Sequence, residues 1–416
     1  MPSPDNPFAA RGIATGAGFT DRADERRALR RALTAAPGTV LLAGERRIGK
    51  SSLLAQVATD LERDRHPVLL VDLWTAATPA DVVTRLVEGA TRALGRRWKD
   101  SALQLLAHLK LTFTLDRQPD GTLVPKPELA LQARATPALA RDLVAALDAL
   151  EALAAAKGEV LGVIVDEFQH IATLFGDDIF RQLRAAIQRH RHVSYVFAGS
   201  DHAVIDRLLA RDAALFKMLQ QLTVGPLPAE HHATWLEERF RTAGMAAAPG
   251  SGRALIEAAG PRTWDVRETA FWLFEHARSA KRAPGPDGVP DAMLAVVAAQ
   301  QPALERVWRT MSPPMQRMLR AVAAEGRGLT THVVLARYGL ASSSHASKAL
   351  KALADAGVIV RLGEGAYAFD DPFFRVWVLG YAMEGGAAPA PPARRASASV
   401  PPARATKRRK RAKKKR

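Results

Sequence analysis

The sequence predicts an α/β fold, a parallel β-sheet covered by helices, followed by an α-helical lid and a winged-helix domain. Three observations support this prediction. Short apolar runs alternate with helical stretches from about residue 39 to 226, which is the order that parallel βαβ units require. The pattern is then almost entirely helical to about residue 340. Last, a helix-turn-helix pattern followed by a hairpin closes the folded part of the chain.

The composition is that of an average globular protein. With 416 residues, 48% hydrophobic and 24% charged, a disordered or collagen-like chain is excluded and two or three domains are expected. No run of about 18 apolar residues occurs and the amino terminus does not resemble a secretory leader. We therefore expect a cytoplasmic protein that does not span a membrane. The lack of cysteine excludes disulfides and thiolate zinc sites.

The strands and domains are predicted from the same patterns. Five apolar runs have the length and composition of strands buried on both faces, namely residues 39–43, 67–73, 161–165, 193–198 and 222–225. The domains that we expect are an α/β domain at 1–227 with a hairpin insert near 111–131, a helical lid at 228–280, a linker at 281–290, a winged helix at 291–384 and a basic tail at 385–416.

A phosphate-binding motif follows the first predicted strand. Residues 44–51 read GERRIGKS and match G-x-x-x-x-G-K-[ST] without a mismatch. The glycines allow a tight turn that points N–H groups at phosphate oxygens, and the next helix adds its positive end. The residues predicted to hold the nucleotide are Gly44, Glu45, Arg46, Arg47, Ile48, Gly49, Lys50, Ser51 and Ser52. Lys50 is also a predicted catalytic residue that bridges the β- and γ-phosphates, and Ser51 would ligate Mg²⁺. This motif predicts a P-loop NTPase fold that binds ATP.

Two adjacent carboxylates end the apolar strand before residue 166. Adjacent side chains at a strand end diverge, so Asp166 can face the metal through a water while Glu167 polarises the attacking water as the general base. A third strand ends at Ser200, which either senses the γ-phosphate or caps the following helix. Together with the phosphate loop, these residues predict Mg²⁺-dependent ATP hydrolysis.

The carboxy-terminal part of the folded chain has the pattern of a winged helix. A helix opened by prolines after Ser312, a second that ends at Gly339 and a third that residues 342–344 cap are followed by two β-prone runs. The third helix of such a domain enters a DNA major groove. The predicted DNA contacts are Ser343, His345, Lys348 and Lys351. Winged helices also dock proteins, and that alternative stays open.

Most of the net charge of +17 lies in the tail. Residues 385–416 contain twelve Lys or Arg and no acid, whereas the rest of the chain has 47 basic and 42 acidic residues. The tail is rich in Ala and Pro and has no apolar periodicity, so we expect it to be disordered. Because each Lys or Arg can neutralise a phosphate, it is predicted to bind DNA. A solubilising tail is the alternative.

Several of these segments together resemble the archaeal-type ATPases, a P-loop class with an additional strand and a catalytic glutamate that is related to AAA+ and STAND NTPases. The matching segments are residues 19–25 (FTDRADE), 44–54 (GERRIGKSSLL), 163–171 (VIVDEFQHI), 197–200 (FAGS) and 371–377 (DPFFRVW). The resemblance covers roughly residues 7–383. It implies an ATP-hydrolysing domain joined to a winged helix, and it implies that residues 19–25 flank the adenine.

The sequence leaves some assignments open. The lid turn at residues 260–263 only approximates the family pattern, so the sequence does not decide whether Arg262 or Arg267 reaches the nucleotide. Residues after the fourth strand could supply an arginine finger to a second copy or form a solvated helix face, which leaves homo-oligomerisation open; they are Arg207, Arg211 and Lys217. The alternative functions are a non-enzymatic, nucleotide-liganded transcription regulator or scaffold, and a STAND-like signalling switch.

Overall fold

The computed structural model describes residues 6–9, 12–35, 37–95, 113–117, 123–127, 135–200, 210, 215 and 217–382. The chain divides into two compact units, the first ending at Val296 and the second beginning at Val297. The predicted basic tail, together with Arg207 and Arg211, lies outside the described residues.

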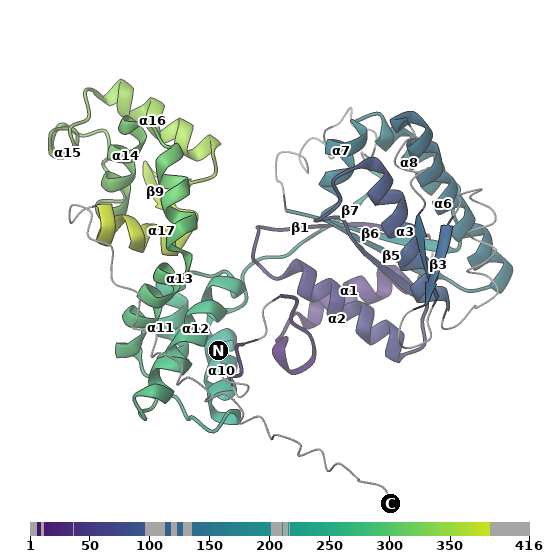
Figure 1. Cartoon of the computed structure of the whole chain (residues 1–416), viewed down its shortest axis with the longest axis horizontal. Helices are drawn as coiled ribbons and strands as arrows, with labels where there is room; N and C mark the ends of the chain where they lie inside the picture. Colours follow the sequence, from purple (N-terminus) through teal and green to yellow (C-terminus); the bar gives the residue numbers. More distant parts are fainter. Residues whose placement is uncertain are drawn as a thin grey trace, which may run out of the picture. The chain divides into compact units, whose positions relative to one another are not determined.

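A five-stranded parallel sheet forms the centre of the first unit, in the order β2-β5-β6-β1-β7 (Figure 1). Its strands are β1 (Thr39–Ala43), β2 (Val68–Asp72), β5 (Leu161–Asp166), β6 (Val193–Gly199) and β7 (Gln220–Thr223). The predicted parallel sheet is confirmed. The last strand lies two residues before the predicted run 222–225, because β7 is an edge strand whose polar residues Gln220 and Gln221 pair with β1 while they stay exposed.

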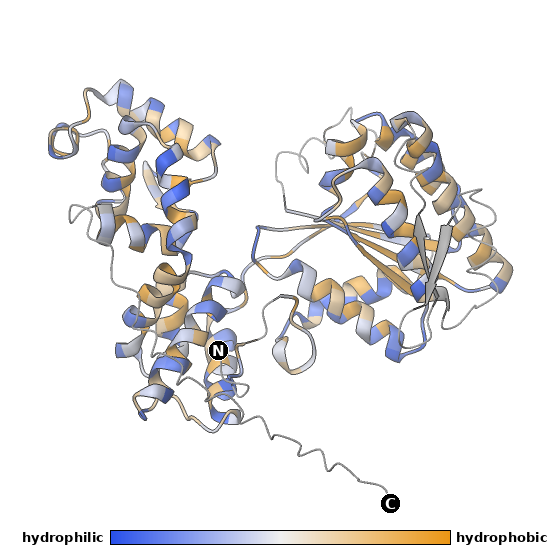
Figure 2. Cartoon of the chain, in the orientation of Figure 1, coloured by the Kyte–Doolittle hydropathy of each residue, from blue (hydrophilic) through white to orange (hydrophobic). Residues whose placement is uncertain are grey.

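Helices cover both faces of this sheet (Figure 1). One face packs against α1 (Ala23–Thr34) and α2 (Lys50–Arg63), and the other against α3 (Pro79–Gly95), α6 (Thr136–Lys157), α7 (Gln169–Phe175) and α8 (Ile179–Ile187). In β1, Val40 and Leu42 face α1 and α2, whereas Leu41 and Ala43 face the opposite layer. Burial on both faces explains why β1, β2, β5 and β6 are mainly apolar, as Figure 2 shows.

The predicted insert contains an antiparallel pair, β3 (Phe113–Arg117) and β4 (Leu123–Pro127). Phe113 pairs with Pro127 at the open end, and Arg117 pairs with Leu123 beside the turn. The Asp-Gly turn itself lies outside the described residues. The two strands form a sheet separate from the five-stranded one.

The rest of the first unit is helical. It comprises α10 (Ala229–Thr242), α11 (Ser251–Ala259), α12 (Thr263–Ser279), the 3-10 turn η2 (Pro286–Gly288) and the start of α13 (Val289–Thr310). The predicted linker at 281–290 packs inside this unit instead of separating two. The Ala248 N–H donates to the Pro284 carbonyl at 2.8 Å, and a Cβ on Gly288 would lie 2.8 Å from Leu273 Cδ1. Glycine and proline here make a packed turn, and the division between the units falls within α13.

The second unit has the predicted winged-helix order. Its elements are α14 (Pro313–Ala324), α15 (His332–Tyr338), α16 (Ser343–Asp355), β8 (Ile359–Gly363), β9 (Ala366–Phe369), α17 (Pro372–Trp377) and the π-helical turn η3 (Val378–Ala382). Gly339 ends α15 in the left-handed conformation, which glycine adopts without steric cost. The Ser342 hydroxyl accepts the His345 N–H at 3.3 Å and so caps α16.

Candidate functional site

The phosphate loop connects β1 to α2, as the motif predicts. A Cβ on Gly44 would lie 2.6 Å from the Val224 carbonyl oxygen, so only glycine fits there. Gly49 has a φ of +101°, and α2 begins at the next residue. The helix therefore directs its amino-terminal N–H groups toward the loop, where they can bind an anion.

Lys50 lies beneath this loop with only 5% of its surface exposed. Its ammonium donates hydrogen bonds to the carbonyls of Gly44 and Glu45, both at 2.7 Å. Burial lowers the pKa of Lys50, while the charges of Glu167 and Asp166 act in the opposite direction. The lysine is thus within electrostatic reach of both carboxylates, although it lies more than a hundred positions before them.

Asp166 at the end of β5 lies near the helix that follows the phosphate loop. Its side chain accepts a hydrogen bond from the Glu167 N–H, at 2.9 Å, and the Ser51 hydroxyl lies close enough to lower its pKa. Burial raises the pKa of Asp166 to about 6, an effect that the nearby Ser51 hydroxyl opposes and the Glu167 charge reinforces. A hydroxyl and a carboxylate near each other are hard oxygen donors of the kind that Mg²⁺ uses together with substrate phosphates. These two residues therefore fit the predicted metal.

Glu167 adopts a left-handed backbone conformation with a φ of +54°. This conformation is costly for a residue with a Cβ and occurs most often at functional sites. The carboxylate accepts hydrogen bonds from the Ser200 hydroxyl, at 3.2 Å, and from the Gln169 amide. Because β6 lies between β5 and β1, Ser200 sits between the two halves of the site. The alternative N-cap role of Ser200 concerns residues 201–209, which lie outside the described residues.

The amino-terminal end of α12 contacts the phosphate loop, which the sequence did not reveal. The Arg47 carbonyl accepts hydrogen bonds from the Thr263 hydroxyl, at 3.2 Å, and from the Trp264 N–H, at 3.3 Å. The Arg47 guanidinium lies 3.4 Å from the buried carboxylate of Asp265 and 5.0 Å from the centre of the Trp264 ring. Both the backbone and the side chain of Arg47 therefore join the loop to the lid.

Four other arginines lie in or near the phosphate loop. Arg262 pairs with Glu45 of the loop at 3.2 Å, whereas Arg267 donates to the Gly12 carbonyl at 3.1 Å. Arg262, not Arg267, is thus the one that contacts the loop. Arg22 is buried and donates to the Ile48 carbonyl at 3.1 Å, so the segment at residues 19–25 reaches the loop. The guanidinium of Arg46 lies over the exposed ring of Trp74, 5.3 Å from its centre.

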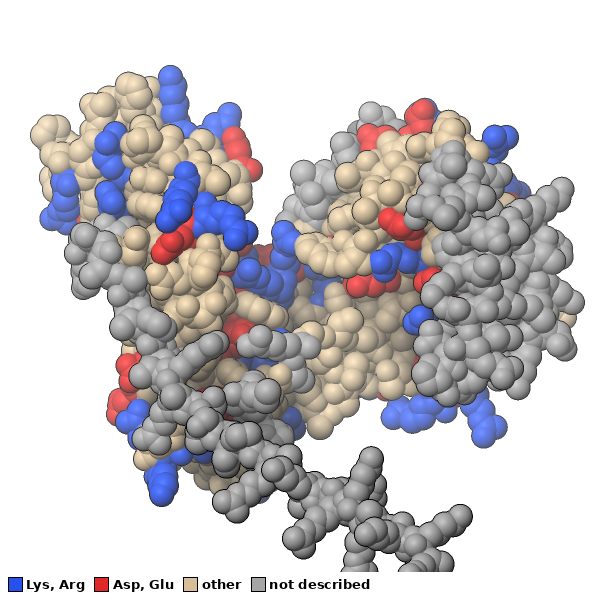
Figure 3. Space-filling model, in the orientation of Figure 1, with Lys and Arg blue, Asp and Glu red and all other residues tan. Residues whose placement is uncertain are grey.

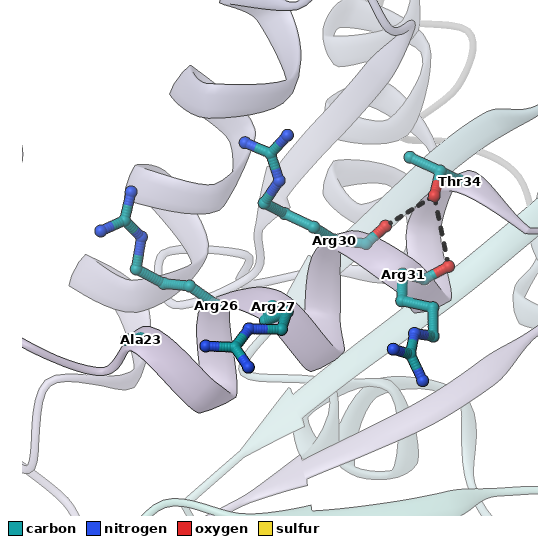
Figure 4. Close-up of a pocket in the computed structure, with 6 residues that line it drawn as sticks. All are labelled: Ala23, Arg26, Arg27, Arg30, Arg31 and Thr34. Atoms are coloured by element: carbon teal, nitrogen blue, oxygen red, sulfur yellow. Dashed lines mark hydrogen bonds between the residues drawn. The ribbon is translucent and has the colours of Figure 1, made fainter.

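A separate hollow of about 450 Å³ lies along α1. Figure 4 shows the residues that line it, which are Ala23, Arg26, Arg27, Arg30, Arg31 and Thr34. Arg26 pairs with the buried Asp60, and Arg30 pairs with Asp64. These carboxylates offset part of the positive charge, and we assign no ligand to this surface.

The predicted DNA contacts all lie on the solvent side of α16. The four side chains are exposed, while Ala346, Ala349 and Leu350 of the same helix are buried. Residues 297–382 carry ten basic and six acidic residues, and Lys and Arg predominate on the face of this unit seen in Figure 3. In its charge, this surface is suited to a polyanion.

Two features are absent from the part of the chain that the structure describes. No group of three or more His, Asp and Glu side chains there is placed to hold a metal ion. A magnesium ion at Ser51 and Asp166 does not need such a group, because nucleotide phosphates and water complete its shell. None of the helices in this part of the chain has the length and apolar character needed to cross a membrane.

Comparison with known proteins identifies both parts of the chain. Residues 34–208 match the model of an AAA domain, and residues 302–380 match that of a probable winged helix domain. No curated protein sequence matches significantly.

Two solved structures show the same fold. A Walker-type ATPase of Pyrococcus abyssi is 18% identical with a TM-score of 0.60, over 89% of this chain and 99% of that one. The ORC1 protein of Aeropyrum pernix, solved in complex with DNA, is 14% identical with a TM-score of 0.50. The match covers 90% of this chain and 96% of that one. The chain thus contains a domain with the P-loop NTPase fold that matches the AAA domain model, followed by a carboxy-terminal domain that matches the winged helix model.

Proposed function

We propose that this protein binds ATP with Mg²⁺, hydrolyses the ATP, and binds DNA through its winged helix and basic tail. The observation that carries the proposal is that β5 and β1 flank β6 in the sheet, and that the Ser51 hydroxyl after the loop lies close enough to Asp166 to lower its pKa. This arrangement places the first helical turn after the phosphate loop beside the end of the acidic strand. A nucleotide triphosphate on the loop would therefore lie beside both carboxylates.

Each residue of the site has a role in this proposal. Lys50 exchanges its bonds with the loop carbonyls for bonds with the β- and γ-phosphates. Ser51 and Asp166 hold Mg²⁺, which offsets the phosphate charge when it is bound. Glu167 accepts a proton from the attacking water, and Ser200 orients the Glu167 carboxylate through their hydrogen bond. The remaining loop residues, Gly44 to Gly49 and Ser52, supply backbone N–H groups and the turn itself.

DNA binding is supported by the second unit. Ser343, His345, Lys348 and Lys351 are exposed on the helix that, in a winged helix, enters the major groove. A structural neighbour of the same fold was solved in complex with DNA. The twelve basic residues of the tail add phosphate contacts that do not depend on DNA sequence.

Two substitutions test the nucleotide half. Lys50→Ala removes the phosphate ligand, and we expect ATP affinity to fall by more than about tenfold. Glu167→Gln keeps the shape of the side chain but removes the base, so ATP binding persists while turnover falls about 10²-fold or more. Titration calorimetry and steady-state phosphate release, with and without DNA, measure the two effects. Lys157→Ala, at an exposed lysine at the end of α6, is the matched control.

The outcomes separate the proposal from its alternative. Equal turnover in the wild type, Lys50→Ala and Glu167→Gln would refute the assignment of the site. ATP binding that depends on Lys50 without phosphate release, with or without DNA, would instead make the protein a nucleotide-liganded regulator.

A further inference from the structure

Trp74 lies at the edge of the candidate site in a hydrogen-bonded turn. About 52% of its surface is exposed, and its backbone N–H donates to the Asp72 carboxylate at 2.8 Å. The preceding residue, Leu73, is buried, and its N–H donates to the Asp166 carbonyl at 3.2 Å. Arg85 of α3 donates to the Asp72 carbonyl at 3.1 Å. Exposure of the indole is therefore a property of an ordered loop next to β5.

Arg46 of the phosphate loop stacks on this ring. Its guanidinium lies 5.3 Å from the ring centre, within the range of a cation–π interaction. His170, which follows Glu167 by three residues, meets the same ring edge-on at 6.0 Å between ring centres. In the part of the chain that the structure describes, no hydrogen bond or ion pair joins Arg46 to another residue. A π-face is thus the principal contact of this guanidinium.

The neighbouring arginine differs in this respect. Arg47 is engaged by Asp265 and Trp264 of α12, so moving it would break a contact with a buried carboxylate. Among the described residues, the exposed ring is the contact that Arg46 would have to leave, and its charge lies within electrostatic reach of Lys50. Of the two loop arginines, Arg46 is therefore the one free to respond to a ligand.

A triphosphate offers Arg46 a stronger partner than the ring. The loop places its N–H groups around the β- and γ-phosphates, and the Arg46 side chain starts from the middle of that loop. A charge-assisted bidentate bond from guanidinium to phosphate is stronger than stacking on an exposed aromatic ring. ADP lacks the terminal phosphate and would leave the stack in place.

We propose that Arg46 binds the γ-phosphate of ATP and leaves the Trp74 ring to do so, which makes Arg46 the residue that distinguishes ATP from ADP. The proposal rests on nucleotide binding at the phosphate loop but not on hydrolysis. The Trp74 ring acts as a competitor for the arginine: it holds the cation in the ADP state and becomes free for other contacts in the ATP state.

Calorimetric titration with adenylyl imidodiphosphate, a non-hydrolysable triphosphate, and with ADP tests the proposal on the full chain. Arg46→Ala should weaken triphosphate binding about tenfold and change ADP binding less than about threefold, and Arg46→Lys should recover part of the loss. Trp74→Leu, which keeps bulk but removes the π-face, should tighten triphosphate binding about twofold to fivefold. Trp74→Phe keeps a ring and is the matched control.

The double variant completes the test. In the Arg46→Ala background, Trp74→Leu should have no effect on triphosphate binding, because the cation for which the ring competes is gone. Equal weakening of both nucleotides by Arg46→Ala, or weaker triphosphate binding in Trp74→Leu, would overturn the proposal. Failure of the proposed function is distinguishable, since the wild type would then bind neither nucleotide or Lys50→Ala would bind as well as the wild type.

Discussion

At the scale of single residues, Asp60 of α2 is a buried carboxylate outside the candidate site. It is fully buried and accepts hydrogen bonds from Arg26, at 2.5 Å, Gln56, at 3.0 Å, and Arg63, at 3.2 Å. Burial by itself would raise its pKa, but the bonds from Arg26 and Gln56 and the nearby arginine charges outweigh it, so that the pKa is lowered. This carboxylate ties α1 to α2 behind the phosphate loop.

Asp60→Asn should therefore destabilise the first unit by about 1–3 kcal/mol at pH 7, because charge-assisted hydrogen bonds in a buried place are lost. A carboxylate with a lowered folded-state pKa contributes its full stability above the unfolded pKa and loses it as the pH falls through the folded pKa. The difference in free energy of unfolding between the wild type and Asp60→Asn should stay constant from pH 7 to 5 and shrink below about pH 4. Urea unfolding at pH 7, 5 and 3 measures it.

A matched control is Asp64→Asn, since Asp64 forms an exposed pair with Arg30 and such pairs contribute little. The interpretation fails if both variants unfold at the same urea concentration as the wild type at pH 7.

At the scale of elements, the packing of α10 against α11 depends on one glycine. A Cβ on Gly252 would lie 2.3 Å from the carbonyl oxygen of Ala233 and 2.7 Å from its Cα. These are backbone atoms and cannot rotate away. Only glycine allows the two helices of the lid to approach so closely.

Gly252→Ala should destabilise the first unit by about 1–3 kcal/mol through overpacking, although alanine favours a helix by up to about 1 kcal/mol over glycine. A loss of stability in Gly252→Ala would show that the steric clash outweighs the higher helix propensity of alanine. Thermal and urea unfolding of the full chain measure it.

The control for this prediction is Gly89→Ala in α3. Its new Cβ would meet Leu69 Cδ1 at 2.6 Å, the far end of a side chain that can change rotamer. A smaller loss than in Gly252→Ala is expected there. If Gly252→Ala were as stable as the wild type, the conclusion that α10 and α11 pack too closely for a Cβ at this position would be contradicted.

At the scale of the whole molecule, charge is distributed unevenly along the chain. Twelve of the 59 basic residues lie in the last 32 positions, without an acid among them. The winged helix presents only Lys348 and Lys351 as cations among the predicted contacts of α16. We therefore expect the tail to dominate the electrostatic part of DNA affinity.

Deletion of residues 387–416 should weaken DNA binding at low salt and make it less dependent on salt. Each lost phosphate contact reduces the slope of log affinity against log salt by about 0.9 on duplex DNA. Fluorescence anisotropy with a labelled duplex between 50 and 300 mM KCl (about sixfold in salt) measures the slope. The double variant Lys348→Ala/Lys351→Ala should reduce this slope by about two at most. An unchanged slope after the deletion would assign the tail to another role.

The sequence by itself determined the elements whose chemistry is local. The phosphate loop occupies eight consecutive residues, the acidic pair directly follows an apolar strand, and the cap of α16 at Ser342 lies three residues from its partner His345. Short continuous apolar runs predicted the sheet, and the helical spacing of apolar residues predicted its helical layers and the helices of the winged helix. In each case, the residues that decide the structure are neighbours in the chain.

Only the tertiary structure decided which distant side chains meet. Arg47 and Asp265 are 218 positions apart, Trp74 lies on a different loop from Arg46, and the glycines and prolines at 281–290 pack into the first unit. No local pattern encodes such contacts, because they depend on how whole helices and strands pack. Hydrophobic burial is non-directional, so it drives this packing without specifying in any short segment which polar groups it brings together.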